Sequence, residues 1–193
     1  QKREDFFNDK WILRIAEGAE AGSVYNVIKT VTSHLKVDEW KRLLDIGGGH
    51  GLYAIGFTAF NPELEAYVFD LPKVTPITCK FIKKYDAQRV QVISGDFNKD
   101  DIGEAYDAIF SSFNQSCSDP KLVTKLVDAL NPDGYLLLRR FKDQAREGAL
   151  KRLDWNLTKV EGKKIGSKPF SGSKIVDKEE YISHLEAVGL SVL

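Results

Sequence analysis

The sequence contains no methionine, not even at position 1, which is unusual for a chain of 193 residues. We therefore expect either a fragment excised from a longer protein or a sequence from which methionines were omitted. If methionines were omitted, some of the residue spacings given below would be short by one residue. An intact mass above 21.7 kDa by methionine-sized steps would indicate omission, and agreement with that mass would exclude it.

An excess of either charge is also lacking, because Lys plus Arg and Asp plus Glu each number 28. No field of one sign therefore attracts the protein to nucleic acid or to an anionic membrane surface. No apolar run is long enough to cross a bilayer, and residues 1–5 lack the apolar stretch of a secretory signal. The composition favours a cytoplasmic protein that acts on a small or nearly neutral molecule.

Cysteine is scarce as well. The two cysteines, Cys79 and Cys117, have neither CxxC spacing nor a histidine cluster nearby. We predict two reduced thiols, no disulfide and no metal site.

What the chain does have is an alternation of short β-rich runs with helical patterns. Apolar periodicity over residues 6–15 and 24–35 predicts two helices before the first strand, with Ser23 as N-cap of the second. Residues 1–41 are thus expected to form an N-terminal helical segment and residues 42–193 a domain with a mostly parallel, doubly wound, Rossmann-like α/β sheet. The predicted strands cover residues 43–46, 66–69, 90–93, 108–110 and 135–138.

The connections carry helix and turn signals. Pro72 suits the first turn of a helix that continues to Ile82, and Asp119 followed by Pro120 predicts another helix start, with that helix reaching Leu130. Residues 131–134 are typical of a turn. The last helix is expected from Asp177 to Gly189, with a capping box at Asp177 and Glu180, followed by the start of a strand over residues 190–193. Residues 162–174 predict a polar loop, since a phosphate loop would need the GxxxxGK[ST] order.

The first predicted strand runs directly into a glycine-rich turn, Gly47-Gly48-Gly49-His50-Gly51. Gly47 and Gly49 would permit a tight turn and the close approach of a ligand to a helix N-terminus, and Gly51 would let helix and strand pack closely. A tight β-to-α turn without a ligand is the alternative interpretation.

Acidic residues follow the next two strands. Asp70, nineteen residues after Gly51, can accept both hydrogen bonds of a ribose diol, although it would also serve as a helix N-cap before Pro72. Asp96, next to Phe97, can accept from an adenine amino group. Acids at two consecutive strand ends favour an adenosine-containing ligand.

Dinucleotide binding is the competing hypothesis, because NAD enzymes share the glycine turn and the ribose acid. Counted from Gly47, however, Leu52 stands where the third glycine of GxGxxG belongs. The pattern is instead Asp-x-Gly-x-Gly-x-Gly, whose Asp45 can accept from an ammonium group and would repel a pyrophosphate. A methionine moiety supplies such an ammonium.

These motifs resemble those of the S-adenosylmethionine-dependent O-methyltransferases that include caffeate-type and hydroxyindole-type enzymes. The resemblance covers most of residues 43–138, including the segments 69–72, 95–97, 106–110 and 130–134. It implies a class I methyltransferase fold and S-adenosyl-L-methionine as cofactor. The residues that would border that cofactor are Asp45 by the reasoning above and, by resemblance, Gly47, Gly49 and Gly51 at the methionine part, Asp70 at the ribose, Leu71, Asp96 and Phe97 at the adenine, and Ser111 and Ser112 after the fourth strand, where the family often has Lys or Arg.

The sequence departs from the family in three places. The family's N-terminal dimerisation domain is represented by two helices only, and the closing strand would follow Leu193. The family's general-base histidine aligns with Gln115, which cannot take a proton at neutral pH. The resemblance allows a homodimer for a full-length parent, whereas a fragment with these limits is expected to be monomeric.

Without that base, Asn114 and Gln115 are the catalytic candidates, as groups that orient the acceptor. The three histidines, His34, His50 and His184, are interpreted as solvated or capping residues, His50 as an exposed one. Trp155 and Asn156 fall where related enzymes build part of the acceptor pocket, although an aromatic residue on a helix is more often part of the core.

The sequence therefore predicts an S-adenosylmethionine-dependent methyltransferase, with O-methyl transfer to a small molecule. The missing base favours an amine, a thiol or an acidic hydroxyl over an ordinary phenol. The alternatives are a protein that binds S-adenosylmethionine without transferase activity and an NAD-dependent oxidoreductase.

Overall fold

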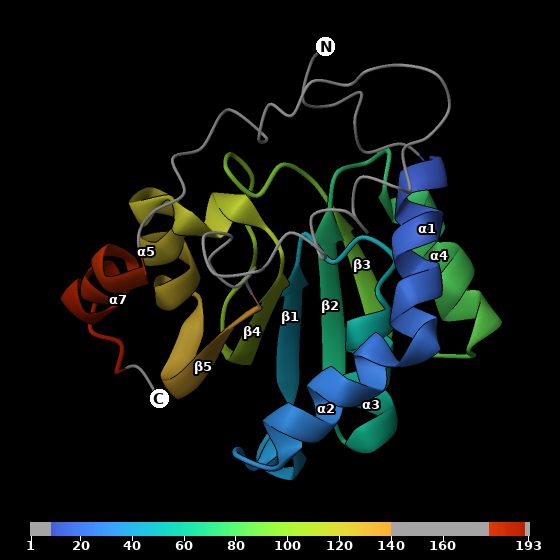
Figure 1. Cartoon of the computed structure of the whole chain (residues 1–193), viewed down its shortest axis with the longest axis horizontal. Helices are drawn as coiled ribbons and strands as arrows, with labels where there is room; N and C mark the ends of the chain where they lie inside the picture. The colour runs from blue at the N-terminus through green and yellow to red at the C-terminus, as the bar shows by residue number, and fades with distance from the viewer. Residues whose placement is uncertain (1–8, 140–177, 192–193) are drawn as a thin grey trace, which may run out of the picture.

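A computed structural model describes residues 9–139 and 178–191, and its centre is a five-stranded parallel sheet (Figure 1). The strand order is β3-β2-β1-β4-β5, and each neighbouring pair is parallel. The strands are β1 (Arg42–Ile46), β2 (Glu65–Asp70), β3 (Val90–Ser94), β4 (Tyr106–Ser112) and β5 (Leu130–Arg139). The predicted Rossmann-like, doubly wound architecture is confirmed.

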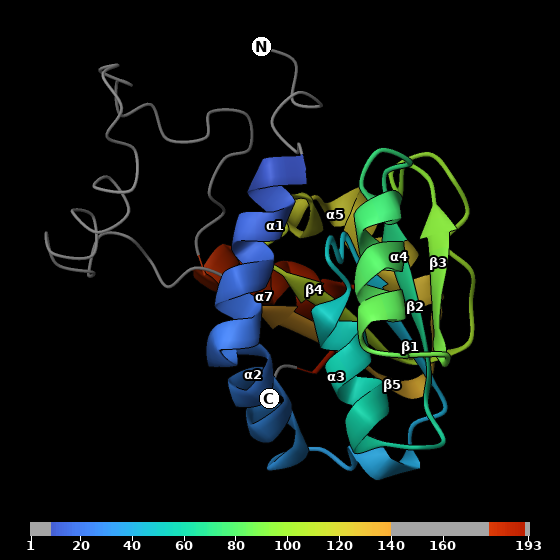
Figure 2. The ribbon, with the colours of Figure 1, turned by 90° about the vertical axis from the view of Figure 1, so that its right-hand side faces the viewer.

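Helices cover both faces of the sheet, as Figures 1 and 2 show. The N-terminal helices together with α3 and α4 lie on one face, and α5 and α7 lie on the other. The bounds are α1 (Asp9–Gly18), η2 (Ala19–Ser23), α2 (Val24–Thr32), η3 (Val37–Glu39), α3 (Leu52–Phe60), α4 (Thr75–Lys84), η4 (Gln115–Ser118), α5 (Pro120–Asp128) and α7 (Lys178–Ala187). Within the described ranges, no helix has the length and apolar character needed to cross a membrane.

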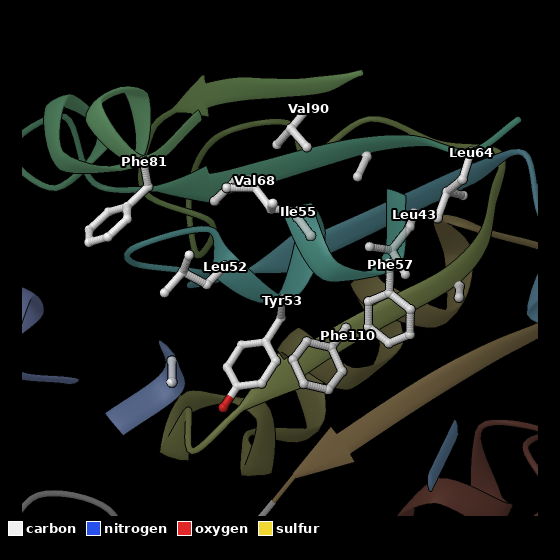
Figure 3. Packing of buried hydrophobic residues seen from close by; sticks show 14 of the residues in the cluster. Leu43, Leu52, Tyr53, Ile55, Phe57, Leu64, Val68, Phe81, Val90 and Phe110 are labelled. Atoms are coloured by element: carbon white, nitrogen blue, oxygen red, sulfur yellow. The ribbon is translucent and has the colours of Figure 1, made fainter. Parts of the chain in front are cut away.

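The larger core lies between the sheet and α3. Figure 3 shows Leu43 of β1, Val68 of β2 and Phe110 of β4 facing Tyr53 and Phe57 of α3. The N-terminal segment belongs to this same core, because α1 and η2 bury Ile12, Ala16 and Ala19 in it. A second core lies on the opposite face, where Leu44 and Ile46 of β1 pack with Leu122 and Leu126 of α5.

The chain reverses its direction of winding beside β1. It builds β2 and β3 on one side of β1 and then crosses to place β4 and β5 on the other side. In open α/β sheets, ligands bind outside the carboxyl ends of the strands at this switch point. A ligand site is therefore expected at the loops after β1 and β4.

Helix α2 begins at Val24 as predicted, but the prediction that Ser23 caps it is wrong. Helix α1 continues through the π-helical turn η2 into α2, with a kink at Gly22, whose φ is 125°. Ser23 makes no capping hydrogen bond and instead contacts Tyr53 and Arg139. A glycine–serine pair at a π-bulge is a recognised cause of such a kink.

Two further boundaries differ from the prediction. Helix α4 begins at Thr75 and not near Pro72, because the Leu71 carbonyl accepts from the amides of Val74 and Thr75 in a turn that precedes the helix. Helix α5 ends at Asp128, and residues 131–134 lie inside β5, where the pairing shifts from Tyr106↔Leu130 to Ala108↔Tyr135. The expected turn is therefore a bulge in a strand.

The C-terminal part is described for residues 178–191 only. Helix α7 ends at Ala187, and Leu190 and Ser191 are not in a strand, contrary to prediction. Asp177 with its capping box, the loop 162–174, and Trp155 with Asn156 lie outside the described residues.

Candidate functional site

The glycine-rich turn connects β1 to α3 at the switch point. The Gly47 amide donates to the Phe69 carbonyl at 2.8 Å, and the Gly51 amide to the Gly48 carbonyl at 2.9 Å. Gly49 and Gly51 have φ values of 56° and 73°, a region that residues with a Cβ rarely adopt. The predicted tight turn is confirmed.

The surroundings of these two glycines differ. A Cβ on Gly51 would lie 2.8 Å from Cγ2 of Thr78 in α4 and 3.4 Å from Cγ2 of Val68 in β2, so the glycine permits close packing against both a helix and a strand. A Cβ on Gly49 would meet nothing within 4 Å. The backbone at Gly49 therefore borders open space, as a ligand would require.

Asp70 is tied to this turn by both carboxylate oxygens. Oδ2 accepts from the Gly49 amide at 2.8 Å, and Oδ1 accepts from the Leu71 amide at 2.7 Å. It caps no helix, because α4 starts at Thr75 with Val74 at its N-cap position. Burial raises the pKa of Asp70, and the two amide hydrogen bonds partly offset this. The carboxylate is thus held in one orientation, with lone pairs left to accept from a diol.

Asp45, at the end of β1, is 1% exposed, and neither carboxylate oxygen has a hydrogen-bond partner among the described residues. Burial, together with the nearby charge of Asp70, raises its pKa to about 8, and the nearby backbone N–H of Ala54, which does not reach hydrogen-bond geometry, offsets this only in part. Its carboxyl group lies against the turn, since a Cβ on Gly48 would come within 2.6 Å of Asp45 Cγ. A buried acid without a partner is a position where a cationic group would be stabilised.

The loop after β3 carries Asp96 and Phe97. The Asp96 side chain accepts from the amide and side chain of Asn98, at 3.1 and 3.0 Å, and forms an ion pair with Lys99 at 3.1 Å. Burial opposes ionisation of Asp96, but these contacts outweigh it and lower its pKa. The loop is held from α5, where Lys125 Nζ donates to the carbonyls of Phe97, at 3.0 Å, and Asp100.

The residues after β4 come close to the glycine turn. Asn114 accepts from the Ser116 amide through Oδ1, and its Nδ2 lies 2.8 Å from the position of a Cβ on Gly47. Phe97 Cε1 lies 3.8 Å from the same position. The structure therefore brings together Gly47, Phe97 and Asn114, which come from three different loops.

The two serines at the end of β4 differ in exposure. Ser111 is 2% exposed, and its hydroxyl is 3.1 Å from the Cys117 sulfur, so it is a poor candidate for ligand contact. Ser112 is half-buried. Gln115 is the first residue of η4, and its side chain lies outside the described part of the structure.

His50 is buried, not exposed as predicted. It is 4% exposed, and its Nδ1 accepts from the Leu52 amide at 3.0 Å, so the expected capping role is confirmed. Burial lowers its pKa to about 4, with a small opposing effect of Glu20. A neutral histidine engaged in this way is a structural residue. His34 is bonded to its own helical turn, and His184 lies on α7.

Sequence reasoning missed Arg139, Tyr53 and Ser23. The Arg139 guanidinium, at the carboxyl end of β5, donates to Tyr53 Oη and, at 2.9 Å, to Ser23 Oγ. The available signal was a charged residue directly after the apolar run 135–138. Within the described ranges, no group of three or more His, Cys, Asp or Glu is arranged to hold a metal ion.

The chain is similar to several known proteins. The chain is similar to the uncharacterised protein MJ0086 of Methanocaldococcus jannaschii, with 39% identity over 192 residues that cover 98% of this chain and 52% of that protein. It is also similar to the acetylserotonin O-methyltransferase of Gallus gallus, with 27% identity over 62% of this chain and 36% of that enzyme. The chain therefore spans about half or less of these relatives.

A solved structure shares the fold. The S-adenosylmethionine-dependent methyltransferase SibL, in its apo form, matches with a TM-score of 0.61 and 24% identity over 81% of this chain and 46% of that chain. The family model of the O-methyltransferase domain matches residues 13–162. Because this match includes the whole β1–β5 sheet and more than half of the sequence, the chain belongs to the O-methyltransferase family.

Proposed function

We propose that this chain is the cofactor-binding domain of an S-adenosylmethionine-dependent methyltransferase that transfers a methyl group to an oxygen of a small molecule. The observation that carries the proposal is the pair of carboxyl groups at the glycine turn. Asp45 is buried without a hydrogen-bond partner among the described residues, and Asp70 is oriented by the Gly49 amide. Asp45 suits an ammonium group, and Asp70 suits a ribose diol.

The residues present fit this cofactor. The methionine ammonium would lie near Asp45 and the turn at Gly47 and Gly49, where a Cβ on Gly49 would enter open space. The ribose would be held by Asp70, and the adenine would lie beside Leu71 and the 96–97 loop. We also assign Ser112 to this site, whereas the contact of Ser111 with Cys117 argues against Ser111.

Bound S-adenosylmethionine would supply an electrophilic methyl group on a sulfonium. Transfer by in-line displacement depends largely on placing the acceptor atom against that methyl group and excluding water. Asn114 is suited to this task, because its Oδ1 is fixed by the Ser116 amide and its Nδ2 lies close to Gly47. We propose that Asn114 orients the acceptor, and that Gln115, directly beside it, assists.

No described histidine supplies a general base in this arrangement, since His50 is buried with Nδ1 occupied. We therefore propose acceptors that are already acidic or nucleophilic, above all an acidic hydroxyl. We place the protein in the cytoplasm, where free cysteines such as Cys79 and Cys117 are ordinary. A full-length parent is proposed to form a homodimer.

Calorimetric titration tests the cofactor. S-adenosylmethionine should bind and NAD should not, and Asp70→Asn should weaken binding by about ten- to a hundredfold, the loss expected for hydrogen bonds to a charged group. Asp128→Asn, on the exposed surface of α5, is the matched control and should bind like the wild type. Binding of NAD in preference to S-adenosylmethionine would refute the proposal.

A second function is a protein that binds S-adenosylmethionine without transferring its methyl group. The absence of a free histidine beside Asn114 among the described residues favours it. Incubation with methyl-labelled cofactor and a panel of acidic phenols, thiols and amines separates the two functions. Label in any acceptor establishes the transferase, and tight cofactor binding with no labelled product across the panel would favour the binding protein.

A further inference from the structure

Arg139 lies at the carboxyl end of β5, at the edge of the candidate site. The proposed cofactor contacts do not include it. It pairs in register with Ser112, the last residue of β4. The loop with Phe113 and Asn114 follows Ser112 directly. The proposed cofactor residues follow β1, β2 and β3, so Arg139 lies on the opposite side of β4 from most of them.

The Arg139 side chain is half-buried and held by neutral groups. Nη1 donates to Tyr53 Oη and Nη2 to Ser23 Oγ, and these two hydroxyls are 3.2 Å apart. The guanidinium carbon lies 4.4 Å from the centre of the Phe113 ring and 5.7 Å from that of Tyr53. Tyr53 is itself fixed in the core beside Phe110, at 5.0 Å between ring centres (Figure 3).

These contacts hold the positively charged guanidinium of Arg139 in place, but none of them brings a negative charge to it. None of the salt bridges among the described residues involves Arg139. A guanidinium has five N–H donors, and the two hydroxyls take two of them. Removing a guanidinium partly from water without an anionic partner is unfavourable, and an anion that contacts the remaining donors would relieve the cost.

We propose that Arg139 binds a carboxylate of the methyl acceptor. A carboxylate matches the planar fork of one guanidinium, whereas a phosphate dianion would call for a second cation, and no described lysine or other arginine shares these contacts. The inference rests on the proposed function, because it places the acceptor over β4 and β5. Tyr53 and Ser23 are positioning residues for Arg139, and Ser23 directly follows the kink at Gly22.

Matched pairs of acceptors test the proposal. Binding is measured by calorimetry in the presence of S-adenosylhomocysteine, with a panel of aromatic hydroxy acids whose hydroxyl is acidic, such as 4-hydroxy-3-nitrobenzoate and 4-hydroxy-3-nitrophenylacetate, each beside its methyl ester. The wild type should prefer at least one acid over its ester by about tenfold or more, the effect of a hydrogen bond to a charged group. Arg139→Gln should abolish this preference while leaving cofactor affinity unchanged.

Two further variants separate binding from structure. Arg139→Lys should keep part of the preference, because it keeps the charge but loses the bidentate geometry. Tyr53→Phe should weaken acid binding and leave ester binding unchanged, which a general loss of stability would not do.

The outcomes are distinguishable from failure of the proposed function. Equal binding of acid and ester in the wild type, no binding of any acid while the cofactor binds, or a preference retained in Arg139→Gln would each overturn the inference. Loss of cofactor binding itself would instead refute the proposed function.

Discussion

Asp45 links the proposed function to a cost in stability. Its pKa of about 8 in the folded chain lies far above the ordinary value of an aspartate because the group is buried and near Asp70. The folded state therefore holds a proton that the unfolded state has lost between about pH 4 and pH 8. Over that range the free energy of unfolding falls as pH rises, by at most about 1.4 kcal/mol per pH unit.

Asp45→Asn should remove this dependence. Because the amide cannot ionise, the variant should unfold at a higher temperature than the wild type at pH 8, and the difference should shrink toward pH 4.5. The same variant should bind S-adenosylmethionine more weakly, since the negative charge that would pair with the ammonium is lost. Thermal unfolding at several pH values and calorimetric titration measure both effects. A variant less stable than the wild type at pH 8 would contradict the assignment of a buried, unfavourable carboxyl group.

At the scale of elements, substitutions in the glycine turn can distinguish the cost of backbone strain from the loss of space for a ligand. Gly49→Ala and Gly51→Ala both place a side chain at positive φ, which costs about 1–2 kcal/mol. Only the Gly51 variant also meets Thr78, at 2.8 Å. We expect Gly51→Ala to be the less stable variant and Gly49→Ala to lose more cofactor affinity than its stability loss explains. Urea unfolding and cofactor titration check the pair, and the reverse ranking in stability would count against the turn as described.

The contact from α5 to the 96–97 loop gives a third prediction. Lys125 Nζ donates to the Phe97 and Asp100 carbonyls, so Lys125→Met should loosen the loop proposed to border the adenine. Cofactor affinity should fall about tenfold and stability by about 1.5–3 kcal/mol, the order expected for charge-assisted hydrogen bonds. Lys121→Met, at an exposed position of the same helix, should change neither. Equal affinities of the two variants would mean that the loop does not contact the cofactor.

The sequence predicted the presence of helices and strands better than the residues at which they begin and end. Strands and helices were recognisable because burial on one or both faces dictates apolar periodicity over several residues. The kink at Gly22, the start of α4 at Thr75 and the bulge over 131–134 depend on backbone bonds that periodicity does not encode. The same limit applies to Arg139, whose contacts with Tyr53 and Ser23 join residues 86 and 116 positions apart in the chain.

The part of the site that lies in the glycine turn could be predicted from the sequence. The backbone geometry of Gly47, Gly49 and Gly51 follows from the motif alone, whereas the hydrogen bond from the Gly49 amide to Asp70 was not predicted because it joins the turn to the end of another strand. The burial of His50 was not predictable, because it arises where Tyr53 and Phe81 surround the ring, at 5.8 and 6.3 Å between ring centres. Phe81 belongs to α4, so only the packing of α4 against α3 determines the environment of that histidine.

For the whole molecule, buried titratable groups near the site should shape the dependence of stability on pH. His50 has a pKa of about 4, below its ordinary value, because it is buried. The unfolded chain then binds a proton that the folded chain does not, so stability rises with pH between about 4 and 6.5. Asp45 acts in the opposite direction over the same range, and the raised pKa of Asp70 acts in the same direction as that of Asp45.

We therefore expect the melting temperature of the wild type to show no net gain from about pH 4.5 to 6.5 and to fall from 6.5 to 8, because the effect of His50 ends near pH 6.5 and that of Asp45 continues to about pH 8. In Asp45→Asn, the effect of His50 should be unmasked, with a rise up to about pH 6.5 and little change above it. Carboxylates such as Asp107, whose pKa is lowered by hydrogen bonds from Lys41, Arg42 and Asn131 against the effect of burial, lose their contribution only at more acidic pH. Scanning calorimetry across pH 4.5–8 on both proteins measures the two profiles. A wild-type melting temperature that climbs steadily to pH 8 would show that Asp45 is ionised in the folded chain, which would contradict the raised pKa of a buried carboxyl group without a partner.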